Sequence, residues 1–64
     1  MTPGDLVKIT RNAIGVPAGT IGLITKVECA EDNHFKLFYY SVLIYRKGKD
    51  LTERRYLRED LRLV

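Results

Sequence analysis

The sequence predicts an all-β fold, a small five-stranded barrel with a short helical turn before its last strand. Apolar and polar residues alternate in several short segments, which is the pattern of strands with one buried face. Glycine, proline and polar residues separate these segments, as is typical of turns and loops. With 64 residues the chain is expected to form one domain, residues 1–64.

The first strand is predicted from Leu6 to Thr10, where Val7 and Ile9 fall on one face. The residues on the opposite face are mostly polar, as expected for a strand that faces water on one side. A loop is expected over residues 11–19, because asparagine, proline and two glycines interrupt the alternation.

The second strand is predicted from Ile21 to Val27, which is rich in β-branched residues. Gly22 within it indicates a bulge or a close approach of two backbones, and either would bend the sheet toward a barrel. The polar segment from Glu28 to His34 is expected to be a second loop.

The longest apolar segment, Phe35 to Arg46, predicts the third strand. One face of this strand carries Phe38, Tyr40, Val42 and Ile44. The other face carries Leu37, Tyr39, Ser41, Leu43 and Tyr45. Because both faces are apolar, this strand offers more apolar surface than one side of a small core needs.

The C-terminal segments complete the predicted barrel. A turn around Gly48 leads to a fourth strand over residues 51–56, a helical turn over 57–60 and a closing strand over 61–64. The alternative is one continuous helix over residues 52–63, since that segment has a capping threonine and two leucines at i, i+4 spacing.

Composition excludes several function classes. A single cysteine and a single histidine permit neither an internal disulfide nor a four-ligand zinc site, so no metal or cofactor is expected. No apolar run approaches the roughly 20 residues of a membrane span, and no signal peptide is recognisable. The expected protein is soluble and cytoplasmic, with no membrane partner.

No catalytic set is expected. Cys29 and His34 could form a nucleophilic pair, but the acidic residues Glu31 and Asp32 lie between them and are unfavourable for an anionic nucleophile. The glycines of residues 15–19 are not followed by a helix that could bind phosphate. The sequence therefore predicts a protein that is not an enzyme.

Two segments resemble known small barrels. Residues 19–27, Gly-Thr-Ile-Gly-Leu-Ile-Thr-Lys-Val, resemble the glycine-centred motif of KOW domains and the corresponding strand of the small photosystem I subunit that docks ferredoxin. Residues 57–64 resemble the short turn and last strand that close SH3-like barrels, including small bacteriophage and cyanobacterial proteins. The resemblance implies an SH3-like fold, and in phage a location in the host cytoplasm or the virion. It leaves the function open, because such folds serve many roles.

The leading hypothesis is a non-catalytic interaction module, a small structural or accessory protein that binds a protein partner or forms a homo-oligomer. Polyproline recognition is not expected, because the chain has no tryptophan for an aromatic groove. Apolar side chains left over on the third strand would form the interface. The residues predicted to bind are Leu37, Tyr39, Leu43 and Tyr45, with Arg46 at the rim. In the alternative, the strand bends and buries different faces at its two ends.

The second hypothesis is an RNA- or DNA-binding domain, as the KOW resemblance implies. Residues 36–64 carry eight basic against four acidic side chains, whereas residues 1–35 carry three against four. Tyr45 or Tyr56 could stack on bases beside this charge. The candidate residues are Lys47, Lys49, Arg54, Arg55 and Arg58. Acidic residues interleaved among them would repel phosphates, and a charged surface of mixed sign also serves solubility alone.

Overall fold

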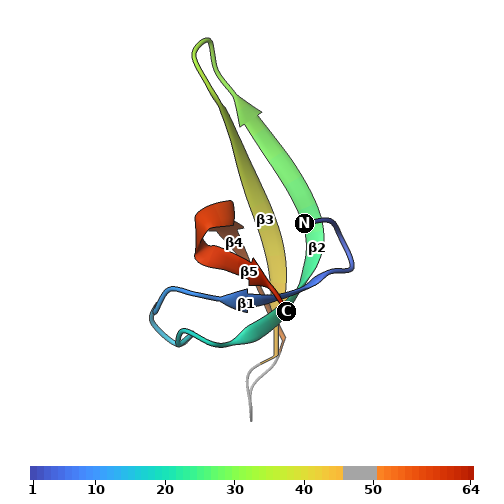
Figure 1. The fold of residues 1–64 in the computed structure, drawn as a ribbon, viewed down its shortest axis with the longest axis vertical. Coiled ribbons are helices and arrows are strands. Elements are labelled where there is room, and N and C mark those ends of the chain that lie inside the picture. Colours follow the sequence, from blue (N-terminus) through green and yellow to red (C-terminus); the bar gives the residue numbers. More distant parts are fainter. Residues whose placement is uncertain (46–50) are drawn as a thin grey trace.

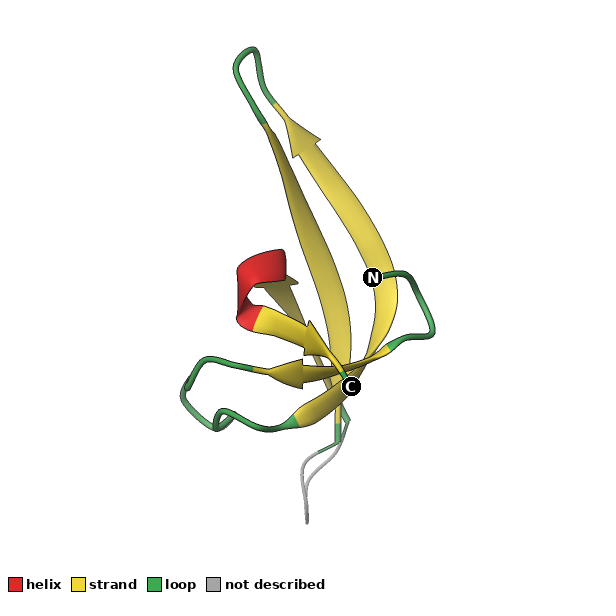
Figure 2. Ribbon diagram, viewed as in Figure 1, coloured by secondary structure: helices red, strands yellow, loops and turns green. Residues whose placement is uncertain are grey.

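The computed structural model describes residues 1–45 and 51–64, and five antiparallel strands form one sheet in the order β4-β3-β2-β1-β5 (Figures 1 and 2). The elements in chain order are β1 (Leu6–Ile9), β2 (Ile21–Glu31), β3 (Lys36–Ile44), β4 (Thr52–Leu57), the 3-10 turn η1 (Arg58–Asp60) and β5 (Leu61–Leu63). The all-β class, the five strands and the helical turn before the last strand are confirmed. Among the described residues β4 and β5 are the two edges of the sheet and do not pair, so a closed barrel is not observed.

The C-terminal segment forms two strands rather than the alternative long helix. β4 pairs with β3 from Tyr39–Leu57 to Ile44–Thr52, and β5 pairs with β1. Pairing with β3 and β1 satisfies the backbone groups that a helix would otherwise satisfy internally. Only the three residues of η1 coil, and they turn the chain from one edge of the sheet to the other.

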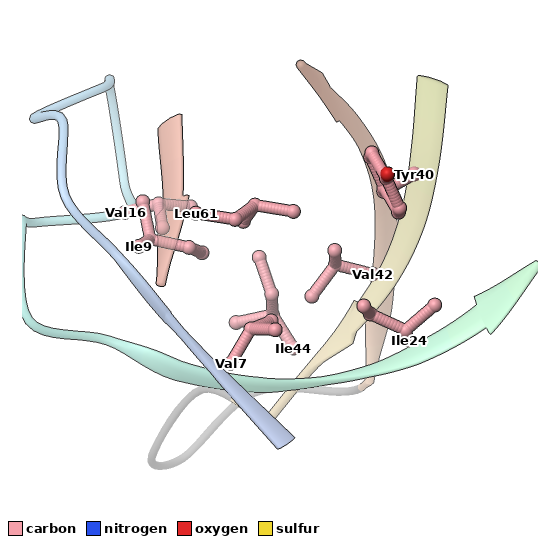
Figure 3. Packing of buried hydrophobic residues seen from close by; sticks show 8 residues of the cluster. All are labelled: Val7, Ile9, Val16, Ile24, Tyr40, Val42, Ile44 and Leu61. Atoms are coloured by element: carbon pink, nitrogen blue, oxygen red, sulfur yellow. The ribbon is translucent and has the colours of Figure 1, made fainter. Parts of the chain in front are cut away.

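The core lies on one face of the sheet, which we call the inner face. The sheet curls over this face, so that side chains from β1 and β5 meet those from β3 (Figure 3). Eight buried apolar residues form it: Val7, Ile9, Val16, Ile24, Tyr40, Val42, Ile44 and Leu61. In β1 and β3 they occur at every second position, as the pleat requires.

The loop between β1 and β2 contributes one core residue, Val16, which strand periodicity could not identify. A small bridge between Ala13 and Val16 turns the loop inward, with both backbone hydrogen bonds formed at 2.9 and 3.0 Å. The side-chain oxygen of Asn12 accepts a hydrogen bond from the Ala18 amide at 2.7 Å. These bonds hold Val16 against the core.

A long hairpin projects beyond the rest of the sheet (Figure 1). The prediction of a loop from Glu28 to His34 was wrong over residues 28–31, because β2 continues to Glu31 and these residues pair with β3. Residues 32–34 do form the turn between the two strands. The ladder between β2 and β3 is interrupted at Thr25, an extra residue between Ile24 and Lys26, as in a β-bulge. We call residues 29–38 the arm; they account for much of the 43 Å long dimension of the molecule, against 22 and 20 Å in the others.

Candidate interaction surface

The face of the sheet opposite the core, which we call the outer face, carries a cluster of aliphatic side chains. Leu6 of β1 pairs with Leu23 of β2, and Leu23 pairs with Leu43 of β3, so three leucines form a row across three strands. Ile21 lies two residues from Leu23 and therefore on the same face. These four residues, Leu6, Ile21, Leu23 and Leu43, are the outer patch.

The outer patch is accessible to solvent. Leu6 is 52% exposed, Ile21 43% and Leu23 36%, while Leu43 is half-buried. Val64 adjoins the patch, because its amide donates a 3.1 Å hydrogen bond to the carbonyl of Leu6. Exposed leucines occur singly on most proteins, but a row of them on neighbouring strands is unusual for a face that meets only water.

The structure divides the residues predicted to bind protein. Leu43 lies in the outer patch, and Tyr45, which follows the last residue of β3, is exposed. Tyr39 is half-buried in another row, between Glu28 and Leu57, and Leu37 is half-buried in the arm. Arg46 lies outside the described residues.

Ser41 separates Tyr39 from the outer patch. Although it lies on the outer face, Ser41 is buried, and its partners on the neighbouring strands are the charged residues Lys26 and Arg55. The Thr25 hydroxyl is within hydrogen-bond distance of both the Ser41 carbonyl and the Glu53 carboxylate, at 3.3 Å each. This polar row therefore limits the patch to one end of β3.

The basic residues do not gather on one surface. Arg54 pairs with Val42 on the inner face, and Arg55 pairs with Ser41 on the outer face, so the two guanidinium groups belong to opposite sides of β4. Arg58 lies in η1. Lys47 and Lys49 lie outside the described residues.

A hollow of about 420 Å³ opens on the inner side of the arm, between the arm and η1. Its apolar lining comes from both ends of the sequence: Met1, Val27, Leu37, Phe38, Tyr40 and Leu57. Lys36, Arg58 and Glu59 supply its charged groups. Phe38, expected on the core face of β3, is on that face but 47% exposed, because no other strand covers the arm.

Lys36 and Arg58 of the hollow form no ion pair within residues 1–45 and 51–64. The described residues form two ion pairs, Arg11–Asp60 and Lys26–Glu28, each with a closest nitrogen–oxygen distance of 3.7 Å. Lys36 and Arg58 take part in neither. The hollow thus presents positive charge beside an exposed aromatic ring.

Tyr56 has a buried hydroxyl with no hydrogen-bond partner among the described residues. Burial raises the pKa of Tyr56, Arg54 acts to lower it, and Asp60 raises it further. No group of three or more acidic, histidine or cysteine side chains in the described part of the chain could hold a metal ion. Nor does any helix within residues 1–45 and 51–64 have the length and apolar character to cross a membrane.

The sequence contained a signal for the outer patch that the prediction did not use. In the first predicted strand, Leu6 falls on the face opposite Val7 and Ile9, so an apolar residue occupies a solvent-facing position. Leu23 falls opposite Ile24 in the same way. Their proximity to Leu43 depends on the register between strands, which alternation within one strand does not specify.

Comparison with protein-family models, with curated proteins and with solved structures finds no match to this chain.

Proposed function

We propose that this chain is a non-catalytic interaction module that binds a protein partner through the outer patch. The observation that carries the proposal is the row Leu6, Leu23 and Leu43, three neighbouring leucines on the face opposite the core, of which Leu6 and Leu23 are exposed among the described residues. Covering this row would remove apolar surface from water at roughly 25 cal/mol per Å². Tyr45, exposed at the end of β3, adds the residue type enriched at interface hot spots.

The proposed role is that of a small structural or accessory subunit. The resemblance of residues 19–27 and 57–64 to SH3-like barrels supports this role, because folds of that kind act through their surfaces. A protein partner is favoured over nucleic acid because Arg54 and Arg55 point to opposite faces, so they cannot follow one phosphate backbone together.

The test is site-specific photo-crosslinking in the cells that make the protein. A photoreactive amino acid replaces Leu6 in one variant and Ile14 in a matched control; Ile14 is 95% exposed and lies in the loop between β1 and β2. We expect a protein adduct at position 6 that is absent at position 14. The adduct should disappear when Leu23→Lys is added, while the circular dichroism spectrum stays unchanged.

Two results would contradict the proposal. An adduct at position 6 that nuclease removes would assign the surface to nucleic acid. An irradiated sample with no adduct at position 6, or with equal adducts at positions 6 and 14, would mean that the outer patch has no dedicated partner.

A further inference from the structure

The arm is a two-stranded extension that the other strands of the sheet do not cover. It consists of two strands that extend past the other three, and a two-stranded hairpin is only marginally stable in water. It nevertheless carries two exposed aromatic rings, Phe35 near its tip and Phe38 on its inner face, which are 59% and 47% exposed. Exposed aromatic surface of this kind is typical of a site that another molecule covers.

The tip of the arm, residues 31–35, carries acidic side chains, whereas the hollow has Arg58 at its edge. The tip carries Glu31 and Asp32 beside Phe35. Asp32 also shapes the turn, because its carboxylate accepts a hydrogen bond from the His34 amide at 3.1 Å. The tip is thus an acidic turn next to an exposed ring.

The hollow is complementary to this tip. Met1, Val27 and Phe38 line it with apolar surface, and Arg58 places a positive charge there, next to Glu59. Lys36 also lines the hollow, but it lies opposite Glu31 across its own arm. Its volume of about 420 Å³ is within the range of sites that hold an aromatic group. The chain cannot fill its own hollow with its own tip, because the tip continues straight on from the strands that line it (Figure 1).

We propose that two copies of this chain exchange arms, each inserting Phe35 into the hollow of the other, with the acidic tip against Arg58. Tip and hollow are close together in each copy, since Lys36 lines the hollow and directly follows Phe35. A twofold axis beside the arms therefore makes both contacts at once, and the assembly closes at two copies. This interface is separate from the outer patch and leaves it free.

The first experiment measures the mass of the purified full chain by sedimentation equilibrium, from about 1 μM to about 1 mM. The proposal predicts a dimer in this range. Phe35→Ser should raise the dissociation constant by about a hundredfold, because a twofold interface contains each substitution twice. The matched control is Ile14→Ser, which removes an exposed apolar residue from another loop and should leave the dissociation constant unchanged.

The second experiment tests the pairing of tip with hollow by charge reversal. Glu31→Arg and Arg58→Glu should each weaken the dimer about tenfold or more, because each places like charges together at both contacts. An equimolar mixture of the two variants should restore the dimer to within about threefold of wild type, since every tip then meets a hollow of opposite charge. Glu31 is chosen rather than Asp32, whose carboxylate holds the turn.

The outcomes are distinct. A wild-type chain that stays monomeric at about 1 mM overturns the proposal, as does a dimer that Phe35→Ser leaves intact. If either charge variant fails to fold, as judged by circular dichroism, the comparison of Phe35→Ser with Ile14→Ser alone tests the proposed dimer. Restoration in the mixture supports arm exchange, whereas separate monomers in the mixture exclude it. Photo-crosslinking at position 6 is independent of these results, because the outer patch lies outside the arm.

Discussion

Gly22 of β2 lies where an added side chain would meet β3. A Cβ atom added there would overlap Cγ1 of Val42, which is fully buried, and would lie 3.1 Å from the Leu43 carbonyl oxygen. Valine has little freedom to move away, because its branched side chain occupies one preferred rotamer and the core around it is close-packed. The close backbone approach expected from Gly22 is therefore present.

Gly22→Ala should lower the free energy of unfolding by about 1–3 kcal/mol through overpacking. Val42→Ala alone should also destabilise, by leaving a cavity. In the double variant the new methyl group occupies part of that cavity, so the loss should be smaller than the sum by about 1 kcal/mol. Urea unfolding of the four proteins measures this, and strict additivity would show that Val42 is not the obstacle.

Tyr56 is a second residue whose environment has a measurable consequence. Its hydroxyl is buried and has no hydrogen-bond partner in the described part of the chain, which is an unfavourable state for a polar group. Its pKa in the folded protein is raised, chiefly by burial, so the neutral form is preferred there. The stability tied to this preference is complete below the unfolded value of about 10 and decreases as the pH rises past it, because the unfolded chain ionises first.

Tyr56→Phe should unfold at the same or a higher urea concentration at neutral pH, with a gain of up to about 1 kcal/mol. Between about pH 9 and pH 11 the wild type should lose more stability than this variant. Tyr45→Phe, which alters an exposed ring, should follow the wild-type pH dependence. If the Tyr56→Phe variant lost as much stability at high pH as the wild type, ionisation of Tyr56 would not be the cause of that loss.

At the scale of elements, the arm is separate from the core. None of the eight core residues except Tyr40 lies within two positions of the arm, and the arm pairs residue by residue without interruption from Cys29–Phe38 to Glu31–Lys36. The turn between its strands is closed by a hydrogen bond from the Asp32 amide to the Phe35 carbonyl at 3.0 Å. Its removal should therefore leave the fold intact.

Replacement of residues 31–36 by Asn-Gly moves the pair that flanks the turn by two positions, from Asp32 and Phe35 to Ala30 and Leu37, which keeps the alternation of hydrogen-bonded pairs and suits a two-residue turn. The shortened chain should be monomeric, so it is compared with the monomeric Phe35→Ser variant. Against that variant the free energy of unfolding should change by less than about 1 kcal/mol, since no buried core side chain is lost. A loss of several kcal/mol relative to Phe35→Ser in urea unfolding would mean that the arm supports the core within one molecule.

The elements show what the sequence could and could not predict. Alternation identified all five strands and the buried positions of β1 and β3, because every second side chain of a half-buried strand faces the core and is apolar. The extension of β2 to Glu31 was missed, since both faces of an isolated arm meet water and polar residues there resemble a loop. Phe38 was placed on the correct face, but alternation does not reveal whether another strand covers that face. The outer patch depends on inter-strand register, and the hollow depends on residues as distant as Met1 and Glu59.

At the scale of the whole molecule, a core of eight side chains is small. A domain of this length typically unfolds with only a few kcal/mol, so that association contributes a large share of its stability. Arm exchange links folding to association, because a dimer that forms only from folded chains stabilises the fold by mass action.

The thermal unfolding midpoint should consequently depend on protein concentration. A hundredfold increase in concentration should raise the midpoint of the wild type by about 5–10 °C, whereas that of Phe35→Ser should stay constant. Calorimetry at two concentrations is sufficient. A wild-type midpoint that does not move with concentration would argue against coupled folding and association.

The open sheet has one more consequence, which concerns aggregation. A sheet with two free edges can add further copies edge to edge without limit, which is the route to fibres. Here β5 is only three residues long, and β4 carries Glu53, Arg54 and Arg55 in succession. Short edges and consecutive charges are the means by which natural sheets resist such growth. Replacing these charges by threonine would therefore remove the protection of an edge rather than weaken the fold, and the first sign would be slow formation of fibrils by a chain that still folds.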